Sequence, residues 1–91
     1  MGKDLEPQIR EHEVRLKSRH PHMTRCRVSV EDRPPHRYEC RRFHVRLDIA
    51  FAGREIVINR EHDEDPDVAL GEAFDAAARQ LEALEAARRR G

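Results

Sequence analysis

The sequence predicts an α+β two-layer sandwich in the order helix, three antiparallel strands, helix. Three patterns predict it: apolar residues alternate on both sides of a glycine over 43–60, they alternate again over 23–31, and they recur at helical spacing over 5–19 and 66–90. Each element therefore has one apolar side, and the simplest packing places both helices on one face of the sheet. We expect a single domain, 1–91, with a modest core.

The first helix is expected over 5–19. Its apolar stripe, spaced i, i+4, i+7 and i+11, consists of Leu5, Ile9, His12 and Leu16. The helix should end at His20, because the residue before Pro21 is driven out of the α region. Four basic residues lie off the stripe and should face solvent: Arg10, Arg15, Lys17 and Arg19.

The first strand is expected over 23–31. Cys26, Val28 and Val30 form its apolar face, and Arg25, Arg27 and Ser29 lie opposite. The stretch 31–39 is predicted to be a loop, because it contains two prolines, is highly charged and lacks periodicity.

A β-hairpin follows. Its first strand carries inward apolar residues at every second position: Phe43, Val45, Leu47, Ile49 and Phe51. Ala52-Gly53 forms the turn, where Gly53 can take the positive φ of a tight loop. The second strand, 54–60, faces inward through Ile56 and Ile58.

The last helix, 66–90, has the clearest signals. Asp65 suits the N-cap position and Pro66 the first helical position. Its stripe consists of Leu70, Phe74, Ala77, Leu81 and Leu84. Gly71 should cost the helix about 1 kcal/mol relative to alanine. Arg88, Arg89 and Arg90 suit the negative end of the helix dipole.

Composition argues against several classes of function. Aromatic residues make up only 4% of the chain, which leaves little material for a deep pocket, and no nucleotide-binding loop or nucleophile motif occurs. We therefore expect no enzyme activity, no cofactor and no metal, since the HPH and HDED clusters match no trusted zinc spacing. The absence of a long apolar run predicts a cytoplasmic protein with no membrane partner. Cys26 and Cys40 are expected to stay unpaired.

The neutral net charge conceals an uneven distribution. Residues 1–60 carry an excess of five positive charges, 61–78 an excess of seven negative charges, and 79–91 an excess of two positive charges. Sixteen of the 18 basic residues are arginines, whose planar donors suit phosphate. A solvated, arginine-rich surface would give the same composition. The candidate phosphate-binding sets are the sheet face with the long loop, or the helix surfaces.

Three segments resemble the short ribosome-hibernation factors, also called ribosome-associated inhibitors: CRVSVE at 26–31, FHVRLDIAFAGREIVINRE at 43–61, and VALGEAFDAAARQLEAL at 68–84. The fold of that family is β-α-β-β-β-α, and this chain begins at the first helix, without the opening strand. The strand at 23–31 would then be an edge, which a second copy could close to form a homodimer.

The resemblance implies a protein that occupies the mRNA and tRNA channel of the small ribosomal subunit and inhibits translation under stress. Its partner would be ribosomal RNA, bound by hydrogen bonds to phosphates without chemistry. The implied RNA contacts are Arg15, Arg19, Arg79, Arg88 and Arg89, with His20 and Arg90 as secondary contacts. Two alternatives are a general module for structured RNA and a protein-interaction module that pairs through its open edge strand.

Overall fold

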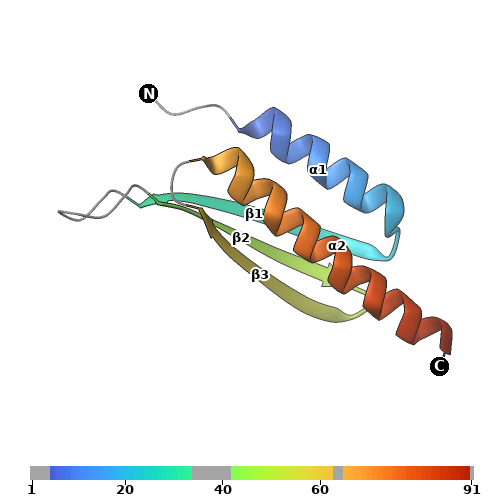
Figure 1. Cartoon of the computed structure of the whole chain (residues 1–91). Coiled ribbons are helices and arrows are strands. Elements are labelled where there is room, and N and C mark those ends of the chain that lie inside the picture. The colour runs from blue at the N-terminus through green and yellow to red at the C-terminus, as the bar shows by residue number, and fades with distance from the viewer. Residues whose placement is uncertain (1–4, 34–41, 63–64, 91) are drawn as a thin grey trace.

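The computed structural model describes residues 5–33, 42–62 and 65–90 (Figure 1). The elements in chain order are α1 (Glu6–Arg19), β1 (Met23–Arg33), β2 (Arg42–Phe51), β3 (Arg54–His62) and α2 (Pro66–Arg90). This is the predicted order. Both helices lie on one face of an open three-stranded antiparallel sheet, so the predicted α+β sandwich is confirmed.

The sheet has the strand order β1-β2-β3, with β2 in the centre. Leu47 of β2 lies opposite Val28 of β1 and Ile58 of β3, so the apolar faces of the three strands coincide. The inward residues of β2 are the most buried in the sheet. Val45, Leu47, Ile49 and Phe51 are each 0–1% exposed. The period-two pattern thus predicted the core face correctly.

The long helix α2 covers this core. Four of the five predicted stripe residues, Leu70, Phe74, Ala77 and Leu81, are buried, and Leu84 is half-buried. Three further alanines are also buried: Ala69, Ala73 and Ala76. Their small side chains let the helix backbone approach the sheet closely, so the apolar stripe is wider than the large residues alone indicate.

The shorter helix α1 adds less to the core. Its only buried residue among those described is Leu16. It packs on α2 through His12, whose ring stacks on Phe74 with 4.8 Å between centroids and 10° between planes. The half of the sheet nearest to β1 is therefore covered more thinly than the half beneath α2.

Two strand boundaries differ from prediction. β1 continues through Arg33, which lies opposite Arg42, so the predicted strand end at Glu31 was too early and the prediction of a loop was wrong for residues 32–33. Pairing with β2 extends the strand through charged residues that have no apolar alternation of their own. β3 likewise reaches His62. The remainder of the predicted loop, with Cys40, lies outside the described residues, and Cys26 carries a free thiol.

The predicted turn and cap are present. Gly53 has φ +80°, and Ala52 also takes a positive φ, +49°, so both central residues of the hairpin turn are left-handed. At the start of α2, the backbone N–H of Asp67 donates to Oδ1 of Asp65 over 2.9 Å.

Candidate nucleic-acid interface

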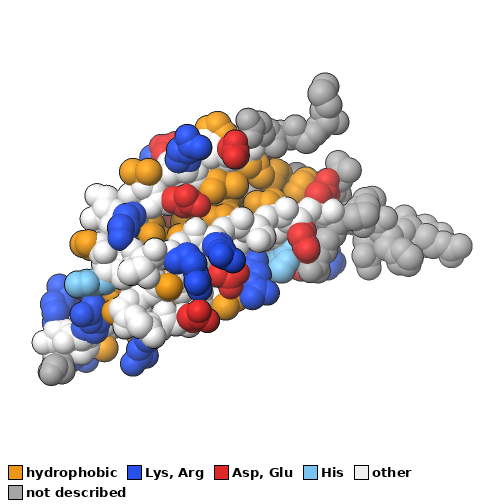
Figure 2. All heavy atoms as spheres, turned by 180° about the vertical axis from the view of Figure 1, so that it is seen from behind, with side chains coloured by type: hydrophobic (Ala, Val, Ile, Leu, Met, Phe, Trp, Pro, Cys, Tyr) orange, Lys and Arg blue, Asp and Glu red, His pale blue; other side chains and the backbone are white. Residues whose placement is uncertain are grey.

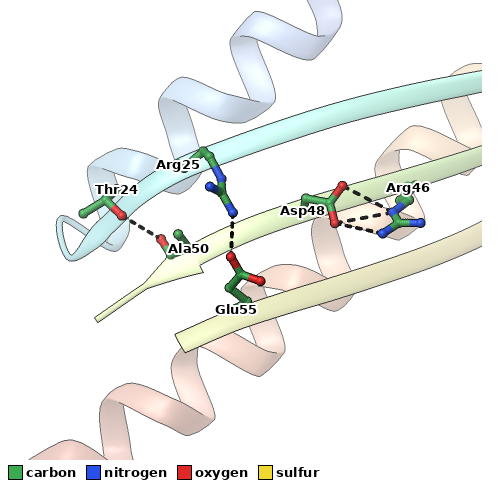
Figure 3. Close-up of polar contacts among 6 residues, drawn as sticks. All are labelled: Thr24, Arg25, Arg46, Asp48, Ala50 and Glu55. Carbon is green, nitrogen blue, oxygen red and sulfur yellow. Dashed lines mark hydrogen bonds and ion pairs between the residues drawn. The ribbon is translucent and has the colours of Figure 1, made fainter. Parts of the chain in front are cut away.

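The outward face of the sheet carries charges that are paired with each other. Arg25 contacts Glu55 at 3.0 Å across the sheet, and Arg46 contacts Asp48 at 3.3 Å within β2 (Figure 3). Arg42 lies 4.0 Å from Glu61. Exposed ion pairs add little to stability, but they balance the local field.

This balance extends over the described outward positions of the sheet. Its arginines are Arg25, Arg27, Arg42 and Arg46, and its carboxylates are Glu31, Asp48, Glu55 and Glu61. These outward positions hold no Phe, Tyr or Trp on which a base could stack. Of the two candidate basic sets, the sheet face is therefore the less suited to a polyanion.

The ends of several elements meet at one end of the molecule. The α1–β1 turn, the β2–β3 turn and the C-terminus of α2 lie together in Figure 1. Phe51 joins them: the rings of His20 and His22 lie 6.4 and 6.3 Å from its ring centroid. The guanidinium carbon of Arg88 lies 6.0 Å from the same centroid, within the range of a cation–π contact.

Exposed arginines surround this junction, which we call the basic end. Its members are Arg19, Arg54, Arg88, Arg89 and Arg90. Within residues 5–33, 42–62 and 65–90, none of them forms an ion pair with a carboxylate. Arg54 and Arg88 border a shallow pocket whose inner wall is Phe51. Two guanidinium groups that border one pocket can both donate hydrogen bonds to a phosphate.

The groove between the two helices extends the basic surface. Arg15 and Arg19 line its α1 side, with Phe74 and Asp75 on its α2 side. Arg79 lies exposed on α2 one residue beyond Ala78, which also lines the groove. Arg15 is held by Glu11 at 2.5 Å, but this pair is exposed and an RNA phosphate can compete for the guanidinium.

His20 differs from the other proposed contacts because it is buried. Its side chain is 4% exposed and packs edge-on against Phe51. Neither ring nitrogen has a hydrogen-bond partner, and both face the protein interior. The adjacent imidazole of His22 is the exposed one. The sequence could not separate them, since both flank Pro21 in a turn without periodicity.

Arg54 is a member of the basic end that the sequence pattern did not single out. It pairs directly with Phe51 across the two-residue turn, which brings it to the pocket bordered by Arg88. The hairpin register was the available signal. It places residue 54 opposite residue 51, but it does not reveal that the end of α2 arrives at the same point.

No three His, Cys, Asp or Glu side chains gather to hold a metal ion among the described residues, which exclude Asp63 and Glu64. Neither described helix is both long and apolar enough to cross a membrane.

Comparison with known proteins identifies the family. The model of the family described as sigma 54 modulation protein / S30EA ribosomal protein matches residues 2–89, nearly the whole chain. Searches of curated proteins and of solved structures found no match. The match spans α1, all three strands and α2 except its last residue, Arg90. The chain therefore belongs to the sigma 54 modulation protein / S30EA ribosomal protein family.

Proposed function

We propose that this protein binds the ribosomal RNA of the small subunit in the channel for mRNA and tRNA and inhibits translation under stress. Membership of the family indicates a ribosome-associated modulation factor rather than an enzyme. The proposal that the protein binds RNA of the small subunit is supported by the basic end. Its five exposed arginines have no carboxylate partner among the described residues. Its acceptors would be phosphates of folded RNA.

The charge distribution favours one orientation of the bound protein. The opposite end of α2 begins with Asp65 and Asp67, and Glu72 follows in its second turn. A chain that is neutral overall but positive at one end is drawn to a polyanion by that end.

The proposed binding requires no chemistry. Charge-assisted hydrogen bonds from guanidinium groups to phosphate oxygens supply the affinity, and the rigid helices fix the positions of the donors. Inhibition would follow from occupancy, because the same space cannot hold mRNA and tRNA. The compartment would be the cytoplasm, where translating ribosomes are found.

The direct test measures binding and inhibition together. Purified protein is centrifuged with isolated small subunits, and its effect on a cell-free translation reaction is measured. We expect co-sedimentation with small subunits, inhibition of translation, and an affinity that falls steeply as salt rises. Absence of the protein from the ribosomal fractions at low salt would overturn the proposal.

A general module for structured RNA is the second candidate. It is favoured by the lack of outward aromatic residues on the described sheet, which points to recognition of phosphates rather than bases. Competition distinguishes the two. An excess of unrelated RNA hairpins should leave binding to small subunits intact if the ribosome is the specific partner, and should abolish it if any folded RNA suffices.

A further inference from the structure

The helices cover the two edges of the sheet to different degrees. On the β3 side, the inward Ile56 and Ile58 are 9% and 3% exposed beneath α2. On the β1 side, the inward Cys26, Val28 and Val30 remain half-buried although they pack against the core. The apolar face of the sheet thus extends beyond the cover that its own helices provide, on the β1 side only.

A groove runs between α1 and this exposed edge. Figure 2 shows hydrophobic side chains open to solvent in the hollow between α1 and the sheet. Val14, on the α1 side of the groove, is 64% exposed, the highest exposure among the large hydrophobic residues described. The other residues that line the groove are Glu13, Lys17, Ser18, Met23, Thr24, Arg25 and Cys26. Backbone groups of β1 that point away from β2 face the same space.

The charges along β1 complement those of a second copy of β1 when the two strands run antiparallel. The strand carries Arg25 and Arg27 in its first half, and Glu31 and Asp32 in its second half, which ends on Arg33. A parallel copy would set arginine against arginine. An antiparallel copy sets the basic half of each strand against the acidic half of the other, which is favourable for directly opposed cross-strand pairs.

One antiparallel register gives favourable side-chain pairs on both faces of β1. With a two-fold axis at Val28, Arg25 lies opposite Glu31 of the second copy on the outward face. On the inward face Cys26 lies opposite Val30 of the second copy, and Val28 meets its own counterpart. Side-chain direction alternates along a strand, so this register keeps all the apolar residues on the helix side.

We propose that two copies of this chain associate through their β1 strands, antiparallel about Val28, to form a continuous six-stranded sheet. The position of α1 is compatible with this arrangement. Glu13 to Ser18 lie against residues 23–26, the first half of β1, so the two-fold axis sets the helix of the second copy over the other half. The proposal concerns the isolated protein and does not rest on ribosome binding.

A charge exchange tests the register. Sedimentation equilibrium measures the dimer dissociation constant of the wild type, Arg25→Glu, Glu31→Arg and the double variant. Each single change converts two attractive pairs per dimer into repulsive ones, which should weaken the dimer about tenfold or more. The double variant restores opposite charges and should recover the wild-type constant. Both residues are exposed, and circular dichroism checks that every variant is folded.

Arg60→Glu is the matched control, because it makes the same charge change at an exposed position on β3, at the other edge. It should leave the dimer unchanged. A wild-type protein that stays monomeric up to millimolar concentration would overturn the dimer. Weakening in both single variants without recovery in the double variant would overturn the register.

Discussion

Phe51 is the residue at which the two turns and the last helix meet. It is 1% exposed, and two histidine rings and the Arg88 guanidinium surround it. A buried ring at the end of β2 therefore fixes the position of charged groups that come from distant parts of the sequence. Packing at one apolar residue is what places Arg54 and Arg88 beside each other.

Next to Phe51, the backbone of the hairpin turn is strained at Ala52. Its φ of +49° lies in the left-handed region, which costs a residue with a Cβ about 1–2 kcal/mol. Asparagine tolerates this conformation better and is favoured before glycine in such turns. We expect Ala52→Asn to raise the free energy of unfolding by about 0.5–1 kcal/mol, as measured by urea denaturation.

Gly53→Ala is the converse change and should destabilise the protein. Nothing lies within 4 Å of a Cβ built at Gly53, so its φ of +80° would be the only cost. We expect a loss of about 1–2 kcal/mol. Equal stability of both variants and the wild type would contradict the left-handed turn.

The thiol of Cys26 makes the free energy of unfolding depend on pH in the alkaline range. Burial, with a smaller contribution from the charge of Glu13, raises the pKa of its thiol from 9.0 to about 11. Between these values the unfolded chain loses the proton while the folded chain keeps it. The contribution is therefore fully present below pH 9 and is lost as pH rises toward 11.

Unfolding of the wild type and of Cys26→Ser isolates this contribution. Urea denaturation at about pH 8 and about pH 10 gives the change in stability for each protein. The wild type should lose more stability over this interval than the variant, in which the thiol is absent. Parallel losses in the two proteins would show that the thiol pKa is not raised.

At the scale of elements, the hairpin and α2 were predictable because long stretches repeat one period. Five alternating apolar residues identified β2, and a capped, alanine-rich stripe identified α2 with its bounds. The end of β1 was not predictable, because residues 32–33 are charged and owe their strand conformation to pairing with β2. The burial of Ala69, Ala73 and Ala76 was not predicted, because alanine occurs on both the buried and the exposed sides of helices.

Gly71 is a point at which α2 can be strengthened. No atom lies within 4 Å of a Cβ built there, so alanine fits without displacement. We expect Gly71→Ala to raise the free energy of unfolding by about 1 kcal/mol, the difference in helix propensity. Thermal unfolding followed by circular dichroism measures it, and a lowered midpoint would indicate that the glycine serves close packing instead.

At the scale of the whole molecule, the uneven charge was visible in the sequence, but its grouping was not. The chain order separates Arg19, Arg54 and Arg88 by more than thirty residues each, and only the fold brings them to one end. Conversely, the sequence does not distinguish the arginines of the sheet from the others as candidate phosphate contacts. The structure does, because it pairs two of them with carboxylates. Cross-strand register and helix docking, which decide both outcomes, are properties of the assembled tertiary structure.

The proposed function requires that the small subunit is held by the arginines of α2 and of the basic end, rather than by the arginines elsewhere on the strands. The most direct measurement is the dissociation constant from isolated small subunits for Arg79→Glu/Arg88→Glu/Arg89→Glu. The matched control is Arg42→Glu/Arg46→Glu/Arg60→Glu, which makes the same change in net charge on exposed strand positions. Circular dichroism confirms the folding of both.

If three phosphate contacts are lost, the helix variant should bind about a hundredfold more weakly, with a salt slope reduced by about three. The control should stay within about threefold of the wild type, since exposed charges outside an interface act only weakly at physiological salt. Unchanged binding of the helix variant, or an equal loss in the control, would contradict the proposed role of the α2 arginines.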